Sequence, residues 1–306
     1  MQTALLIEQI LNGLQFGVML FLMAAGLTLI FGVMGVINLA HGSLYMLGAF
    51  ACAAVATATG SFWLGLVASL AAAAAAGAVV ELLVIRRLYD RDHLDQVLAT
   101  FALILIFSEG TRWMFGSFPL YLDIPPVLSG AIDLPGGVRY QLYRLAIIVV
   151  GIAVAIGLHL LISRTKLGMR IRAGQSDREM IAALGVDIRT LYTIVFALGA
   201  ALAGLAGAMV GALQSVQVGM GEPVLILAFV VIVVGGIGSI KGAMVGAAIV
   251  GVVDTLGRFL LPQFFVLFLG PSEGTTVGAA LASMLIYIVM ALILAFRPRG
   301  LFAAGA

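Results

Sequence analysis

The chain has 306 residues, of which 63% are hydrophobic and only 10% are charged, and its mean hydropathy is +1.20. Soluble domains carry about 25% charged residues, so this composition excludes a soluble globular protein and predicts a membrane protein. The formal net charge of +2 is uninformative by itself. A single cysteine, Cys52, excludes a disulfide framework and a cysteine-based metal cluster.

Nine apolar runs follow one another along the chain, and a membrane-spanning helix needs about 20 mostly apolar residues. The runs are 10–31, 42–58, 62–85, 97–115, 142–162, 190–211, 223–239, 243–261 and 276–296. The seventh run is short and ends in glycines, so it is either a complete span or a broken, re-entrant one. We therefore expect an all-α, polytopic transmembrane helix bundle with eight to ten spans, nine being the working number. A single transmembrane domain over 1–306 is expected.

A polar, glycine-rich segment, 32–42, separates the first two runs. Asn38 and His41 lie there between apolar stretches, where polar groups need partners. Gly35 and Gly42 permit a backbone break that would turn carbonyl and N–H groups toward a cavity. These four residues are candidates for a substrate pathway. A tight turn in which Asn38 caps the next helix is an equal alternative.

Lys and Arg concentrate in three segments, which hold 11 of the 16 basic residues: 86–95, 163–189 and the tail with Arg297 and Arg299. Nine spans place all three segments on one side. The positive-inside rule makes that side the cytoplasm. The C-terminus is then expected inside and the N-terminus outside. The outer loop 116–141 is rich in Pro and Gly, and it serves either as a connector or as a docking surface.

Within the basic loop 163–189, a short stretch is predicted to form a helix that ends at Gly185. Met180, Ala183 and Leu184 share one face of it by their spacing. A small apolar ridge on a helix outside the bilayer suits insertion into a groove of a partner protein. A membrane-surface helix anchored by arginines is the alternative. The candidate residues for coupling this chain to such a partner protein are Glu179, Met180, Ala182, Ala183, Leu184 and Gly185.

The next run carries small residues at every fourth position, a pattern that permits close packing of helices. These residues are Gly199, Ala203, Gly207 and Gly211. The pattern predicts packing, within the subunit or with another, and says nothing about substrate.

Charged residues inside the apolar runs are predicted to be structural. Glu109 and Arg112 are three residues apart, and Asp254 and Arg258 are four apart, so each pair can form on its own helix. Glu81 is expected to reach the membrane interface. Catalytic triads, carboxylate dyads and metal constellations are absent from the sequence, so an enzyme is not expected.

An internal repeat is predicted because the segment 235–242 aligns with 35–42 at an offset of 200 residues. Glycine-interrupted segments at matching positions mark the pathway in many transporters. The second set of pathway candidates is Gly235, Gly236, Gly238 and Lys241. A phosphate-binding loop is excluded here because Lys241 precedes Gly242 without the required Ser or Thr. The chain therefore has no ATP site.

Several of these segments together resemble the branched-chain amino-acid permease family of ATP-binding cassette importers, of the leucine/isoleucine/valine type. The matching segments are 32–42 with 45–49, 172–177 with 182–185, 196–199 with 203–207, and 235–239 with Gly242 and Gly246. The likeness covers nearly the whole chain. The segment 179–185 matches the Glu-Ala-Ala…Gly coupling signature of such importers only loosely.

The resemblance implies a multi-pass permease of the bacterial inner membrane, importing branched-chain or other amino acids. It implies a second homologous permease, two cytoplasmic ATP-binding subunits that use Mg-ATP, a periplasmic substrate-binding protein and surrounding lipid. No cofactor in this chain and no nucleic-acid partner are expected. The alternatives are an importer of urea or short-chain amides and an ion-coupled secondary transporter.

Overall fold

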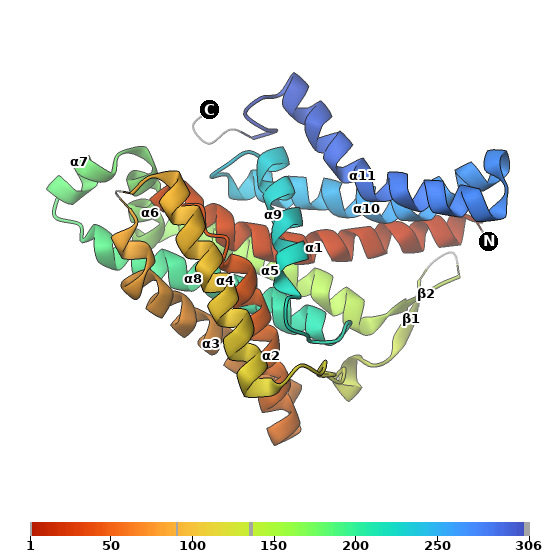
Figure 1. Ribbon diagram of the computed structural model, residues 1–306, viewed down its shortest axis with the longest axis horizontal. Helices are drawn as coiled ribbons and strands as arrows, with labels where there is room; N and C mark the ends of the chain where they lie inside the picture. The colour runs from red at the N-terminus through yellow and green to blue at the C-terminus, as the bar shows by residue number, and fades with distance from the viewer. Residues whose placement is uncertain (1, 90, 135–136, 303–306) are drawn as a thin grey trace. The chain divides into compact units, whose positions relative to one another are not determined.

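The computed structural model describes residues 2–89, 91–134 and 137–302 (Figure 1). The long helices are α1 (Gln2–Met34), α2 (His41–Thr59), α3 (Phe62–Leu83), α4 (His93–Phe115), α5 (Leu142–Arg164), α8 (Ile188–Gly211), α10 (Ile240–Leu269) and α11 (Pro271–Phe296). The shorter elements are the helices α6 (Lys166–Ser176), α7 (Arg178–Ala183) and α9 (Gly221–Gly235), and the 3-10 turns η1 (Ile85–Arg87) and η2 (Pro126–Leu128). Strands β1 (Ala131–Leu134) and β2 (Val138–Gln141) form an antiparallel hairpin inside the predicted outer loop.

Eight helices in the described part of the chain are long and apolar enough to cross a membrane. This confirms the predicted all-α class and the lower end of the predicted span number. The seventh apolar run forms α9, whose 15 residues are too few to count as a span. Its helix stops at Gly235 because Gly236 and Gly238 adopt positive φ angles of 106° and 83°.

The gap 262–275 between the last two predicted apolar runs implies a loop there, and that expectation is wrong. Helix α10 continues through Pro262 to Leu269, and only a turn at Gly270 separates it from α11. Proline removes one helical hydrogen bond, but the apolar sequence around it remains more stable as helix than as an unpaired backbone in an apolar environment. Gly278 of α11 packs closely on this region, since a Cβ there would lie 2.6 Å from the Pro262 nitrogen.

The chain forms two compact units. The first unit comprises Met1–Phe21, Pro126–Ile152 and Phe229–Ala306, and the second comprises Leu22–Pro125 and Ala153–Ala228. Three of the unit boundaries lie within α1, α5 and α9, and the fourth lies between Pro125 and Pro126, at the start of η2.

In the second unit, α2, α3 and α8 pack against one another through small residues. Gly204 of α8 lies where the three helices meet: its carbonyl accepts a hydrogen bond from Ser69 Oγ of α3 at 2.8 Å, and Gly48 of α2 lies against it. The predicted small-residue ridge faces the interior, because Gly199 packs on Gly26 of α1 and Gly207 on α2. The ridge therefore serves packing within the chain.

In the first unit, α10 packs closely on the N-terminal part of α1. A Cβ at Gly13 would lie 2.8 Å from Val252 Cα, and a Cβ at Gly17 would lie 2.6 Å from the Ala247 carbonyl oxygen. Arg144 at the start of α5 reaches the same part of α1, donating to Asn12 Oδ1 at 3.1 Å. Glycines thus bring two long helices into backbone contact.

Candidate functional site

The first predicted backbone break is present between α1 and α2. Helix α1 ends at Met34, Gly35 has φ +67°, and α2 begins at His41. Asn38 and His41 are fully buried. Asn38 does not cap α2 as the alternative supposed: the cap position is Ala40, and Asn38 Oδ1 accepts the Ala40 N–H at 3.0 Å. The Asn38 carboxamide thus closes a turn in front of the helix.

This break lies inside the second unit rather than beyond the end of α1. A Cβ at Gly26 would lie 3.0 Å from His41 Nε2, and Gly26 precedes the end of α1 by eight residues, about 12 Å of helix. The chain therefore turns back along α1 before α2 begins. Helix α2 therefore starts inside the second unit, and its first turn is buried among α1, α8 and α9.

The second predicted break is present between α9 and α10, in the first unit. Ser239 caps α10 by accepting the Gly242 N–H at 3.0 Å. The end of α9 is capped by the C-terminal tail, because the N–H groups of Leu301 and Phe302 donate to the Val234 and Gly235 carbonyls at 2.9 Å.

The two breaks differ in their surroundings. Lys241 is exposed and Gly238 is partly exposed, whereas Asn38 and His41 are buried. Gly35 and Gly42 lie with Asn38 and His41 in the second unit, and Gly235 and Gly236 lie with Gly238 and Lys241 in the first. The four candidates of each break therefore lie together, one set in each unit. That the two sets form a repeat and border one path stays a prediction.

The predicted short helix of the basic loop is α7, which begins at Arg178, one residue before the candidate Glu179. Asp177 caps it by accepting the N–H groups of Glu179 and Met180 at 3.0 and 2.9 Å. Gly185 follows with φ +84°, a conformation that β-branched residues resist, so the predicted glycine end is confirmed. The remaining candidates lie between the Asp177 cap and Gly185; they are Ala182, Ala183 and Leu184.

The ridge predicted on α7 is exposed. Met180 is 59% exposed and Leu184 is 76% exposed, and Ala183 between them is exposed as well. Ile181 points the other way and is only 6% exposed. Two large apolar side chains that extend from a charged loop form a surface that a partner can cover.

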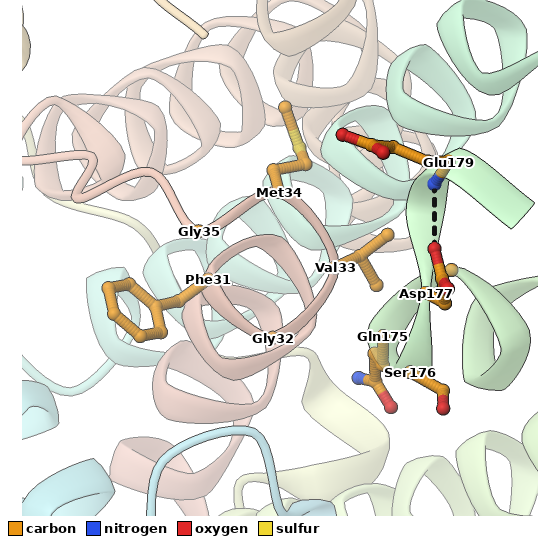
Figure 2. Close-up of a pocket in the computed structure, with 10 residues that line it drawn as sticks. Phe31, Gly32, Val33, Met34, Gly35, Gln175, Ser176, Asp177 and Glu179 are labelled. Carbon is orange, nitrogen blue, oxygen red and sulfur yellow. Dashed lines mark hydrogen bonds between the residues drawn. The ribbon is translucent and has the colours of Figure 1, made fainter. Parts of the chain in front are cut away.

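A cavity of about 410 Å³ lies between the end of α1 and the α6–α7 corner, both in the second unit. Figure 2 shows the residues that line it. Its walls are formed by 31–35 on one side and by 174–177 with Glu179 on the other. The residue Gly35 therefore belongs both to the wall of this cavity and to the first break.

Glu81, which by its position near the end of α3 could reach the membrane interface, is fully buried within the protein. Its carboxylate accepts hydrogen bonds from Arg86 at 3.1 Å, from Thr193 of α8 at 2.6 Å, and from the Tyr89 hydroxyl. Burial and this carboxylate raise the pKa of Tyr89. The cluster ties the end of α3 to the start of α8. Sequence reasoning missed Thr193, since its 112-residue separation from Glu81 leaves no local signal.

Asp187 organises the start of α8 in the same region. It accepts the N–H groups of Arg189 and Thr190 at 3.0 and 3.3 Å, and its bond from the Thr190 hydroxyl, with these N–H bonds, lowers the pKa of its carboxyl group. Both ends of the 184–187 connection are therefore held by caps, so α7 is linked to α8 by a short, defined segment.

Both predicted charge pairs on single helices are present. Arg112 donates to Glu109 at 2.5 Å and Arg258 donates to Asp254 at 2.9 Å. Among the described residues, His, Cys, Asp and Glu side chains form no group of three or more that could hold a metal ion.

Four buried polar side-chain atoms of the second unit escaped the sequence reasoning. Thr28 Oγ1, Ser43 Oγ, the Tyr45 hydroxyl and Glu222 Oε2 are buried without a hydrogen-bond partner in the described structure. Their only sequence signal is a polar residue at the edge of, or within, an apolar run. Long-range packing, which no local pattern reports, is what buries them.

Comparisons with known proteins agree with the resemblance. The family described as "Branched-chain amino acid transport system / permease component" matches residues 9–294. The chain is 29% identical to the high-affinity branched-chain amino acid transport system permease protein BraD of Pseudomonas aeruginosa, over 96% of this chain and 95% of that protein. It is 27% identical to the corresponding permease protein LivH of Escherichia coli K12, over 83% and 87% of the two chains. It is 28% identical to a probable branched-chain amino acid transport permease protein LivH of Methanocaldococcus jannaschii, over 92% and 89%. No solved structure gives a significant match.

Proposed function

The chain belongs to the family of branched-chain amino acid transport permeases, and on that premise we propose how it moves its cargo and meets its partners. As the permease component of an ATP-binding cassette transport system, it is a multi-pass membrane protein without an ATPase site of its own. In this proposal residues 1–306 form one permease domain. Together with a second homologous permease it forms the pore for amino acids across the inner membrane.

The exposed ridge of α7 carries this proposal. Two cytoplasmic ATP-binding subunits bind the permeases, one of them covering Met180, Ala183 and Leu184 with a groove of its own surface. The exposure of these side chains, the cap at Asp177 and the end at Gly185 support a rigid docking helix rather than a loose loop. Glu179 and Ala182 complete the docked turn.

Motion of α7 would reach the pathway through the end of α1. The cavity between 31–35 and the α6–α7 corner allows these elements to approach or separate. In the proposal, ATP-driven closure of the ATPase subunits moves α7, and α1 transmits that motion to Asn38 and His41 at the start of α2. The second break, at Gly235, Gly236, Gly238 and Lys241, would border the same path.

Orientation and delivery complete the proposal. Although α9 is too short to count among the eight long helices, in this proposal the chain also crosses the membrane between α8 and α10, through α9. The basic segments 86–95, 163–189 and the tail then all face the cytoplasm, so the C-terminus is inside. The opposite side then carries the hairpin of β1 and β2, where a periplasmic substrate-binding protein would deliver the cargo. The names of the relatives favour branched-chain amino acids over urea or short amides. Because Glu109 and Asp254 each pair with an arginine on their own helix, an ion-coupled carrier that uses these two acids is disfavoured.

The test is Ala183→Asp, which places a charge at the centre of the α7 ridge. A desolvated, unpaired charge in an interface costs about 2–5 kcal/mol, so ATPase association should weaken by about 30-fold or more. Uptake should fall while the permease still inserts in the membrane. Co-purification of the ATPase subunits and uptake in proteoliposomes would be measured together.

Ala173→Asp is the matched control, because Ala173 is also an exposed alanine of the same loop but lies on α6. It should leave both measurements near the wild-type values. If Ala183→Asp behaves like Ala173→Asp, α7 is not the coupling element, and the membrane-surface alternative takes its place.

A further inference from the structure

The start of α2 gathers buried polar groups that have no hydrogen-bond partner in the described structure. Asn38 Nδ2 and Ser43 Oγ are both unpartnered, on residues that are 0% and 2% exposed. Tyr45, the fifth residue of α2, adds a further buried hydroxyl group of this kind. Because an unsatisfied polar group in a water-free membrane interior is costly, a cluster of them calls for an explanation.

The unpartnered donors lie at a helix N-terminus. The Asn38 carboxamide is anchored by its oxygen on the N–H of Ala40, the residue that precedes α2, so its free NH₂ group is held at the helix start. Ser43 is the third residue of α2. A helix N-terminus carries a partial positive charge and favours anions, and here it is supplemented by free side-chain donors. The chemistry of this group therefore suits a carboxylate.

A second helix N-terminus contacts the first. Helix α9 begins at Gly221, and a Cβ at Gly42 would lie 2.8 Å from the Gly221 carbonyl oxygen. The Gly219 N–H, just before α9, points to Met46 Sδ at 3.4 Å. The starts of α2 and α9 are thus in backbone contact, and all of these residues belong to the second unit.

Glu222, the second residue of α9, contributes the opposite charge. Its Oε2 atom is buried and accepts no hydrogen bond from the residues that the structure describes. A Cβ at Gly219 would lie 3.5 Å from Glu222 Oε2. The Glu222 carboxylate therefore lies beside Gly219, whose N–H points to Met46. A buried carboxylate oxygen without a donor suits an ammonium group, which supplies three.

We propose that the contacting starts of α2 and α9 form a binding site for the cargo amino acid as a zwitterion. Asn38 and Ser43 would receive the cargo carboxylate, and Glu222 would receive its ammonium group. This inference rests on the proposed import of amino acids. The inference adds the residues that recognise the carboxylate and the ammonium group of the cargo. Urea and short-chain amides lack both of these charges.

The close contact of Gly42 and Gly221 makes this a closed site. Neither residue has a side chain, so the two helix starts meet without space between them. Cargo can enter only when the first turns of α2 and α9 separate. Since the break at Gly35 precedes α2, a motion of that segment can separate these turns.

The first test uses Glu222→Gln, which keeps the shape of the side chain and removes its charge. In the complete importer in proteoliposomes, uptake of leucine should fall about 10- to 100-fold, the factor that corresponds to one charged hydrogen bond. ATP hydrolysis stimulated by the loaded binding protein should persist. Glu273→Gln is the matched control, because Glu273 is an exposed glutamate in the first turn of α11.

The second test measures binding of radiolabelled ligands to the purified permease–ATPase complex without the binding protein. Wild type should bind leucine more tightly than leucinamide, which lacks the carboxylate, and than 2-hydroxyisocaproate, which lacks the ammonium group. Glu222→Gln should remove the preference over the hydroxy acid, and Ser43→Ala should weaken the preference over the amide. Elution of the intact complex shows that each variant has folded.

The outcomes distinguish failure of the proposed function from failure of the site. If wild type imports no amino acid, the proposed function is wrong. If wild type imports leucine while Glu222→Gln matches Glu273→Gln in uptake and keeps all ligand preferences, the proposed function stands and the zwitterion site is refuted.

Discussion

Gly204→Ala tests whether the meeting point of α2, α3 and α8 limits the stability of the second unit. A Cβ at Gly204 would lie 2.5 Å from the Ala73 Cβ and 3.0 Å from the Ser69 carbonyl oxygen. Ordinary contacts begin near 3.4 Å. Helices α3 and α8 must therefore separate, and the 2.8 Å hydrogen bond from Ser69 to Gly204 would lengthen or break.

The size of the effect follows from three contributions. Overpacking costs about 1–3 kcal/mol. Loss of the hydrogen bond costs about 0.5–1.5 kcal/mol. Alanine regains about 1 kcal/mol of helix propensity relative to glycine. The net destabilisation is therefore about 0.5–3.5 kcal/mol, and the midpoint of thermal unfolding of the purified permease should fall by several degrees at ~2–4 °C per kcal/mol.

Two variants make this prediction specific. Ala73→Gly removes the methyl group that the new one would meet, so the double variant should recover much of the lost stability, with a coupling of about 1 kcal/mol or more. Gly110→Ala is the control, since a Cβ at Gly110 meets nothing within 4 Å. It should leave the midpoint unchanged or raise it. Equal midpoints for Gly204→Ala and Gly110→Ala would refute the reasoning.

Two further predictions concern orientation and the second break. Ser176→Cys, on the exposed α6–α7 corner, should resist an impermeant thiol reagent in intact cells, whereas Ser117→Cys in the outer loop should react; the reverse pattern would overturn the proposed topology. Gly238→Leu should block uptake in an assembled complex, because its φ of +83° strains a branched side chain and the added bulk fills the break. Gly238→Asn, with a residue that tolerates this conformation, should retain more uptake; normal uptake by Gly238→Leu would contradict a pathway role.

Local chemistry in the sequence determined the class of the protein and several of its elements. Apolar runs long enough for a bilayer had to become helices, because a membrane interior leaves no other partner for the backbone. The helix α7 and its glycine end, and the pairs Glu109–Arg112 and Asp254–Arg258, depend on residues within a few positions of one another. The family resemblance depends on motifs of the same local kind.

Only the tertiary structure decided what the interior residues contact. Glu81 is buried against Thr193, and α10 continues through Pro262 against Gly278. The contact of Gly42 with Gly221 joins helix starts that are 179 positions apart in the numbering. Such contacts depend on which helix faces meet, and a periodic pattern reports that a face is small or apolar without naming its partner. The buried polar groups at the start of α2 became visible as unpaired only once those partners were known.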